Sequence, residues 1–416
     1  MSGYLKNFRS TTFVFFQHTN MNLSSRLLLF SEPETLKMAR LGRELRAQGK
    51  DIVDLSLGEP DFDTPTHIKE AAKKAIDDNF SHYTPVSGYL DLREAICHKF
   101  SRDNNLDYTP ENIVVSTGAK QSLANAVLSI ISKGDEVIIP TPFWVTYAAL
   151  VQLGEGEVKL LKTTLESGYK ITPKQLEAAI TAKTKLFIFS SPSNPTGAIY
   201  KKEELQALAE VFIKHPQVFI ISDEIYEYIN YCGCHESIAQ FDELKNQTIV
   251  INGLSKGFAM TGWRLGYLAA PKEVAKACEK LQGQFTSGTN AVTQRAAITA
   301  LSSPLDATHR MVEEFERRKN RVMELMKDID GFEYVEPDGA FYAFPRVHSY
   351  FGKTDGESTI KNADDLAMYL LHKGAVSTVT GSAFGDDECI RISYANSMAN
   401  IEKGFQRIIE TLQQLH

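Results

Sequence analysis

Along the middle of the chain, short apolar runs rich in β-branched residues alternate with stretches that have helical patterns. The apolar runs predict strands at residues 112–116, 136–139, 186–190, 218–222 and 248–252. Helices are predicted between them, for example at residues 122–131 and 202–214. Most of the strands are continuously apolar, which is typical of strands buried on both faces of a mainly parallel sheet. The alternation therefore predicts an α/β domain of three layers.

The pattern changes after about residue 306. A long, charged amphipathic helix is predicted at residues 310–329, and short strands follow near residues 341–344 and 390–393 before a final helix from Met398. This order predicts a smaller α+β domain that closes against the first. We therefore expect an N-terminal tail, an N-terminal part of the small domain, a large α/β domain and a C-terminal part of the small domain, at residues 1–30, 31–65, 66–306 and 307–416.

Composition narrows the class of protein. The chain has 416 residues, of which 43% are hydrophobic and 23% charged, so it is long enough for two globular domains with their own cores. The net charge of -7 gives no electrostatic reason to expect nucleic acid or an anionic membrane as partner. No uninterrupted apolar stretch approaches the ~20 residues that a membrane-spanning helix needs.

Cysteine usage and the N-terminus bear on the compartment. Cys232 and Cys234, two of the five cysteines, are too close for a C-x-x-C pair, so free thiols in a reducing, cytoplasmic setting are expected. Residues 1–31 contain no Asp or Glu, a composition faintly typical of a transit peptide. The alternatives are a frayed tail, or an upstream start codon with Met21 as the true beginning.

Polar residues follow four of the predicted strands, at the point where each strand ends. In open α/β sheets, ligands bind beyond the carboxyl ends of the strands. Small residues at a helix start also let backbone N–H groups approach an anion. Four strand ends thus deliver candidate groups to one crevice, in the segments 117–120, 194–197, 223–226 and 253–256, with Arg264 after the last.

Each of these groups also has a simpler explanation when it is taken alone. Asp223 could cap a helix, and residues 194–197 could form only a turn. The segment around Lys256 could be a solvated loop, and Trp144 could be an ordinary core aromatic. The combination favours a binding site, because one ligand that needs all of these groups accounts for them together.

Several of these segments resemble the motifs of one protein family. Residues 255–267 look like the pyridoxal-lysine motif of class I aminotransferases. Three further family motifs are matched in order, at residues 194–197, 223–226 and 391–394. Two further segments resemble the prokaryotic-type aspartate aminotransferase subgroup. They are residues 58–65 and Tyr83-Thr84 followed by Gly88. The resemblance covers roughly residues 31–410 and implies the fold type I architecture of enzymes that use pyridoxal 5′-phosphate.

The resemblance also implies roles for the cofactor-binding residues. Lys256 would hold the cofactor covalently and then move the substrate's Cα proton. Asp223 would keep the pyridine nitrogen protonated, while Asn194 and Tyr226 would bond the phenolic oxygen. Trp144 would stack on the cofactor ring. The remaining cofactor contacts, mainly to the phosphate, would come from Gly118, Ala119, Lys120, Ser255, Arg264 and, from the neighbouring subunit of a homodimer, Tyr83.

Substrate recognition follows from the same resemblance. Arg391 would clamp the α-carboxylate, with Asn194, Trp144 and the backbone of Gly58 completing that part of the site. Residues 284–290, where part of the family carries an arginine for the substrate's side-chain carboxylate, contain none. Lys120 and Thr35 are the candidates to replace it. The alternative is that Lys120 is a solvated residue of the first helical turn and Thr35 only a helix cap.

The resemblance therefore implies transfer of the amino group of L-aspartate to 2-oxoglutarate in a ping-pong reaction, giving oxaloacetate and L-glutamate. A prephenate or aromatic amino acid aminotransferase remains an alternative, as does another enzyme of this fold that releases ammonia or carbon dioxide. A DNA-binding regulator with an aminotransferase-like sensor fits poorly, because fewer than about 35 residues precede the resemblance. The resemblance further predicts cis peptide bonds before Pro142 and Pro195.

Overall fold

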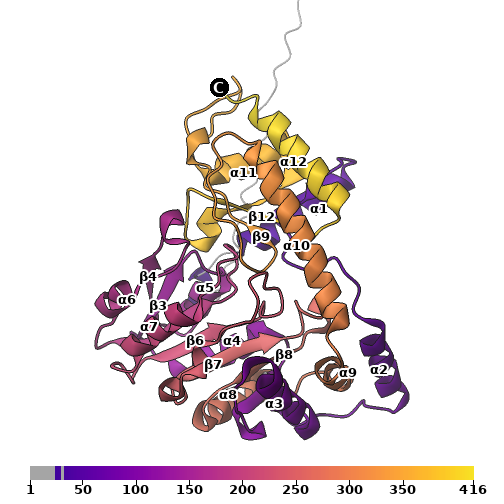
Figure 1. The fold of residues 1–416 in the computed structure, drawn as a ribbon, viewed down its shortest axis with the longest axis vertical. Helices are drawn as coiled ribbons and strands as arrows, with labels where there is room; N and C mark the ends of the chain where they lie inside the picture. The colour runs from indigo at the N-terminus through magenta and orange to yellow at the C-terminus, as the bar shows by residue number, and fades with distance from the viewer. Residues whose placement is uncertain (1–23, 30–31) are drawn as a thin grey trace, which may run out of the picture.

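The computed structural model describes residues 24–29 and 32–416, so most of the expected N-terminal tail lies outside the described residues. A sheet of seven strands forms the lower half of the molecule in Figure 1, in the order β2-β8-β7-β6-β5-β3-β4. β8 runs antiparallel to β2 and β7, and the other neighbouring pairs of this sheet are parallel. The strands are β2 (Ile113–Ser116), β3 (Glu136–Thr141), β4 (Glu157–Lys162), β5 (Thr184–Ser190), β6 (Phe219–Asp223), β7 (Thr248–Gly253) and β8 (Gly266–Ala269).

Helices cover both faces of this sheet, because successive strand residues point to opposite sides. Ile249 and Ile251 pack on the side of α4 (Ala119–Ile130), α5 (Thr146–Leu153) and α8 (Lys272–Phe285). Val250, between them, packs on the opposite side. That side is covered by α2 (Thr66–Asp77), α3 (Leu90–Asn104), α6 (Pro173–Ala179), α7 (Lys202–Phe212) and α9 (Ala291–Ser302). The predicted three-layer α/β arrangement is confirmed.

The upper part of Figure 1 contains smaller sheets and the remaining helices. The strands β11 (Val379–Thr380), β12 (Ile390–Ser393) and β9 (Tyr342–Ala343) pair antiparallel in that order. The long α10 (Asp306–Lys327) rises from the level of α9 to this part. The other helices here are α1 (Glu34–Ala47), α11 (Ala363–His372) and α12 (Met398–Leu412).

Residues from the beginning of the chain are joined to this C-terminal part. The strand β1 (Val53–Asp54) pairs in parallel with β10 (Val376–Ser377). Just beyond it, the N–H of Ser393 donates to the carbonyl of Leu55 at 2.8 Å. The segment that follows β1 therefore runs beside β12 of the small antiparallel sheet. The domain boundaries at residues 66 and 306 stay predictions.

Two details of the backbone bear on the predictions from the sequence. The Thr141–Pro142 and Asn194–Pro195 peptide bonds are cis as expected, and Ser191–Pro192, which was not predicted, is also cis. Within the described part of the chain, no helix has the length and apolar character needed to cross a bilayer.

Candidate active site

A cavity of about 380 Å³ lies at the carboxyl ends of the sheet strands, where the N-terminal segment and β12 approach them. It brings together all but two of the residues singled out in the sequence. Those that line it are Thr35, Gly58, Ala119, Lys120, Trp144, Asn194, Asp223, Tyr226, Ser255, Lys256, Arg264 and Arg391.

Lys256 follows the end of β7 and points across the cavity. Its Nζ donates to the carbonyl oxygen of Gly58 and lies 5.7 Å from the ring centre of Tyr226. Burial lowers the pKa of Lys256 to about 8; the carboxylate of Glu59 opposes this shift, and the cations of Arg391 and Arg264 add to it. A substantial fraction of the amine is therefore neutral at mildly alkaline pH, as a nucleophile or a base requires.

Asp223 ends β6 and offers a buried carboxylate to the same cavity. Its Oδ2 accepts a hydrogen bond of 2.7 Å from the hydroxyl of Tyr147. Burial raises the pKa of Asp223 to about 6, although the Tyr147 hydrogen bond acts in the opposite direction. A cationic N–H held against this carboxylate would stabilise its charged form. No helix occurs between residues 224 and 237, so Asp223 is not a helix cap.

The N-terminus of α4 and the side chain of Arg264 form a cationic end of the cavity. Gly118 precedes the helix with φ +85°. A Cβ at Gly118 would lie 2.3 Å from Nη2 of Arg264, so only glycine allows the guanidinium to approach this turn. Gly118 itself does not line the cavity, whereas Ala119 and Ser255 do. Unbonded N–H groups in a first helical turn and a guanidinium are suited to a phosphate.

Arg391 is a buried cation, and the described part of the chain places no carboxylate beside it. It projects from β12 and is 2% exposed. Nη1 donates to Oδ1 of Asn194 at 2.9 Å and Nη2 to the carbonyl of Ser56 at 2.7 Å. Nε has no partner among the described residues, and none of their carboxylates lies within 4.0 Å of the guanidinium. Burial lowers the pKa of Arg391, so an anionic ligand would relieve an unfavourable arrangement.

Aromatic side chains form the remaining walls. Trp144 meets Tyr147 edge to face with ring centres 5.7 Å apart, and Nζ of Lys120 lies 5.0 Å from the Trp144 ring centre. The hydroxyl of Tyr226 is 2.7 Å from that of Tyr342. Tyr83 lies outside the cavity, and its side chain is fully exposed on the surface.

The sequence analysis did not identify several residues of the site. Tyr147 follows Trp144 by one helical turn, and this spacing could have revealed it. Ser56 contributes a backbone carbonyl, and Tyr342 lies in a short apolar strand, so neither carries a distinctive signal. Glu59 accepts a hydrogen bond of 2.9 Å from Thr261, and both line the cavity.

The donor set fits pyridoxal 5′-phosphate on the features of this cavity alone. Its aldehyde needs a lysine amine of lowered pKa, its ring nitrogen a carboxylate, and its phosphate a helix N-terminus with an arginine. Lys256, Asp223 and Arg264 supply these groups around one space. Arg391 remains for the carboxylate of an amino acid. Fold and cavity together therefore define an enzyme that processes amino acids with this cofactor.

Comparisons with known proteins agree. The profile of the family "Aminotransferase class I and II" matches residues 50–408. An aspartate/prephenate aminotransferase of Cereibacter sphaeroides is 44% identical over 391 residues, covering 93% of this chain and 97% of that protein. An aspartate aminotransferase of Bacillus subtilis is 42% identical over 391 residues, covering 93% and 98%. The crystal structure of the Rhizobium meliloti aspartate aminotransferase has a TM-score of 0.92 and 40% identity, covering 95% of this chain and all of that one.

The chain thus belongs to the class I and II aminotransferases, which use pyridoxal 5′-phosphate.

The first prediction concerns Lys256→Ala. The variant should fold, because this lysine follows a strand end and its amine makes a single hydrogen bond, to Gly58. It should lose the covalent cofactor link, seen as a changed absorbance spectrum, and turnover should fall by at least ~100-fold because a general base is removed. Turnover close to that of the unsubstituted enzyme would contradict the assignment.

The second prediction concerns Asp223→Asn, which keeps the shape of the side chain but removes its charge. Loss of one partner of a buried ion pair is worth roughly 3–5 kcal/mol, or about 100- to 5000-fold in kcat. Cofactor should still bind. Asp242→Asn, at an exposed position, is the matched control. Unchanged kcat in Asp223→Asn would show that its charge is not needed.

Proposed function

We propose that this chain is an aspartate aminotransferase that passes the amino group of L-aspartate to 2-oxoglutarate in a ping-pong reaction, giving oxaloacetate and L-glutamate. The observation that carries the proposal is the buried, anion-free guanidinium of Arg391 in the same cavity as the amines of Lys256 and Lys120. One cation suits an α-carboxylate, and a second suits the carboxylate of a dicarboxylic side chain.

Arg391 and Lys256 do the work on the amino acid. Arg391, oriented by Asn194 and the carbonyl of Ser56, binds the α-carboxylate through its planar fork. This contact aims the Cα–H bond at the Lys256 amine. When bound, the cofactor withdraws electrons from the bonds of Cα, so that the Cα proton becomes acidic. Lys256 takes that proton and delivers it to the C4′ carbon of the cofactor, first as base and then as acid.

Other residues hold the cofactor in place. Asp223, whose carboxylate Tyr147 fixes by a 2.7 Å hydrogen bond, would pair with the pyridine nitrogen. Tyr226 and Asn194 would bond the phenolic oxygen, and Trp144 would stack on the ring. The phosphate would be held by Arg264, Ser255 and the N–H groups near Gly118 and Ala119.

Lys120 and Thr35 are the proposed readers of the distal carboxylate. Burial lowers the pKa of Lys120, and the neighbouring Arg264 lowers it further. A substrate anion would offset both effects. Thr35 belongs to α1 and lines the cavity with its neighbours Pro33 and Leu36. A structure similar to this chain, the Thermus thermophilus aspartate aminotransferase at TM-score 0.88 and 37% identity, contains maleate, a dicarboxylate.

Prephenate is the second candidate donor, because it also carries two carboxylates. The relative from Cereibacter sphaeroides is named for aspartate and prephenate, and the one from Bacillus subtilis for aspartate alone. A panel of aspartate, glutamate, aromatic amino acids and the amino product of prephenate, each with 2-oxoglutarate or oxaloacetate, separates these candidates. An enzyme that uses only aromatic donors would overturn the proposal.

We propose a homodimer as the working unit. The large exposed apolar side chains include Ile76, Tyr83, Leu90 and Phe285, which are 62%, 100%, 55% and 68% exposed. A second cavity reaches Arg264 from outside the first and is lined in part by Thr117, Asn290 and Thr293. Tyr83 of a second copy would enter there and donate its hydroxyl to the cofactor phosphate.

A cytoplasmic location stays a prediction. The five cysteines are free thiols in the structure.

The third prediction tests substrate choice with Lys120→Ala. Truncating one partner of a buried charge pair costs about 2–5 kcal/mol, so kcat/KM for aspartate should fall at least ~30-fold. For phenylalanine the fall should stay within ~3-fold, because no distal carboxylate is present. Lys133→Ala, an exposed lysine just after α4, is the control. Equal losses on both substrates would assign Lys120 to the cofactor or the fold.

The fourth prediction concerns Tyr83→Phe, which keeps the ring and removes the hydroxyl. Hydrogen bonds to charged groups are worth about 1.5–3 kcal/mol, so affinity for pyridoxal phosphate should fall ~10- to 150-fold. Light scattering should still show a dimer. Tyr334→Phe, whose hydroxyl bonds the carbonyl of Met323, is the control. A monomeric unsubstituted protein, or unchanged cofactor affinity in Tyr83→Phe, would contradict the proposed dimer site.

A further inference from the structure

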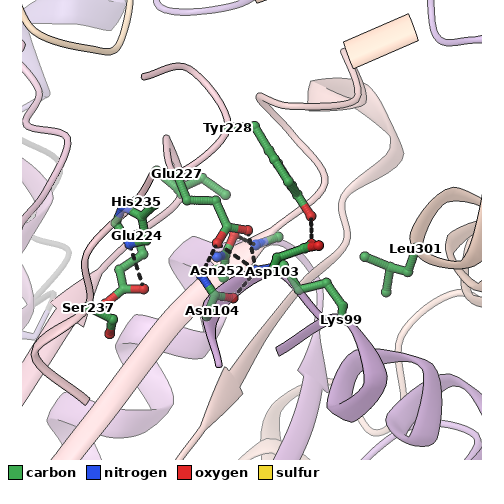
Figure 2. A network of polar contacts seen from close by, with 12 residues as sticks. Lys99, Asp103, Asn104, Glu224, Glu227, Tyr228, His235, Ser237, Asn252 and Leu301 are labelled. Atoms are coloured by element: carbon green, nitrogen blue, oxygen red, sulfur yellow. Dashed lines mark hydrogen bonds and ion pairs between the residues drawn. The ribbon is translucent and has the colours of Figure 1, made fainter. Parts of the chain in front are cut away.

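Behind the strand end that carries Asp223 lies a cluster of four buried ionisable side chains, shown in Figure 2. The buried charge cluster consists of Lys99 from α3, Glu224 and Glu227 from the turn after β6, and His235. Lys99 and Glu224 are 0% exposed and Glu227 is 4% exposed. The His235 side chain is 5% exposed. None of the four lines the active-site cavity.

Two carboxylates and two cations pair within the cluster. Glu224 accepts hydrogen bonds from Ser222 at 2.8 Å and Ser237 at 2.6 Å through Oε1, while its Oε2 lies 2.9 Å from Nε2 of His235. Lys99 donates to Glu227 and, at 2.7 Å, to Asn104. With His235 protonated, the cluster is neutral.

A metal ion is the first occupant to consider, because ligand atoms of Glu224, Glu227 and His235 lie within 4.8 Å of one another. The ammonium of Lys99, however, is already bonded to Glu227. A divalent cation would have to displace this ammonium or share a carboxylate with it at close range, where like charges repel. The chain therefore supplies the cations of the cluster itself, and the arrangement indicates an electrostatic role.

That role concerns Asp223, the residue next to Glu224 in the chain. Burial is the largest effect on the pKa of the Asp223 carboxyl and raises it, while hydrogen bonds from Tyr147 and from the N–H of Ile225 lower it. The charge of Glu224 is a smaller effect that raises this pKa again. Burial alone would lower the pKa of His235, but attraction to Glu224 and Glu227 outweighs both burial and the repulsion of Lys99, so the pKa is raised. The protonated imidazole of His235 thus offsets the charge of Glu224, which would otherwise disfavour a charge on Asp223.

We propose that His235 is a positioning residue: its ion pair with Glu224 cancels the charge of that carboxylate, so that Asp223 stays ionised where it faces the cofactor nitrogen. The proposal rests on the place assigned to Asp223 in the proposed function, but not on the identity of the amino donor.

Other charged groups also surround His235 and Asp223. His235 also lines a separate cavity with Asp103, Glu227, His309 and Glu313. Of these, Asp103 is paired with Arg102 and with the hydroxyl of Tyr228. On the other side of the strand, Asp223 faces Tyr147 and the amine of Lys256. Glu224 bonds to His235, and its charge acts on Asp223. The proposal can therefore be tested at Glu224.

The test compares His235→Gln with the double variant Glu224→Gln/His235→Gln. The affinity of cofactor-free protein for pyridoxal phosphate is measured against pH by fluorescence quenching. His235→Gln leaves Glu224 uncompensated, which raises the pKa of Asp223, and its charge is then lost at a higher pH on acidification. The pH below which the affinity for pyridoxal phosphate is lost (the acid limb) should rise by about one unit. At the pH of the original midpoint, the affinity of His235→Gln should be several-fold lower than that of the original protein. In the double variant, the acid limb should return to its original pH, and the affinity for pyridoxal phosphate should return to within about 3-fold of that of the original protein.

If His235→Gln does not fold, a single substitution of Glu224 tests the direction in which the acid limb moves. Glu224→Gln removes the charge itself, so the acid limb should move down rather than up. Aspartate turnover should follow the same order, with kcat changing more than KM. Lys272→Gln, which breaks the exposed pair with Glu111, should change nothing beyond a small stability difference.

Two results would overturn the proposal. The first is a double variant as impaired as His235→Gln, which would show that the pair only holds the turn by hydrogen bonds. The second is an acid limb that does not move in either single variant. Because binding of the cofactor is measured without any amino acid, failure of the proposed substrate assignment would leave these readings intact.

Discussion

The site depends on one constraint of sheet geometry: strands that run in parallel end at the same edge. β5, β6 and β7 are parallel neighbours. Asp223 is the last residue of β6, and Asn194 and Lys256 follow β5 and β7 by a few residues. Because these strands end side by side, the three side chains line the same cavity. The N-terminal segment and β12 complete the cavity with Gly58 and Arg391.

The side chains at this edge of the sheet carry more positive than negative charge. Among the described residues, four cationic side chains line the cavity, against two carboxylates, those of Glu59 and Asp223. In a poorly solvated space such an excess is unfavourable unless anions enter. The phosphate of the cofactor and the carboxylate of an amino acid are anions that would offset this excess. The cations are Lys120, Lys256, Arg264 and Arg391.

Much of this could be predicted from the sequence, and the exceptions have physical reasons. The five predicted strands were confirmed because each is an apolar run between turn residues. β4 was missed because it is an edge strand and four of its six residues are exposed. β8 was missed because it has only four residues and begins inside the lysine motif. Candidate residues at strand ends were found by position. Tyr147 reaches Asp223 through tertiary packing, and the buried charge cluster joins Lys99 to Glu227, 128 positions apart, which no local pattern reveals.

The pairing of β1 with β10 has a consequence for how the protein is made. Val53 finds its partner in Val376, so the two residues that meet are 323 positions apart in the chain. On a ribosome, the segment that carries Gly58 emerges early and waits without its strand partner until most of the chain has been translated. Closing so long a loop is slow, and the waiting segment is exposed to wrong partners in the meantime. The wall of the active site is therefore among the last parts of the protein to reach its native place, although its residues are among the first to be synthesised.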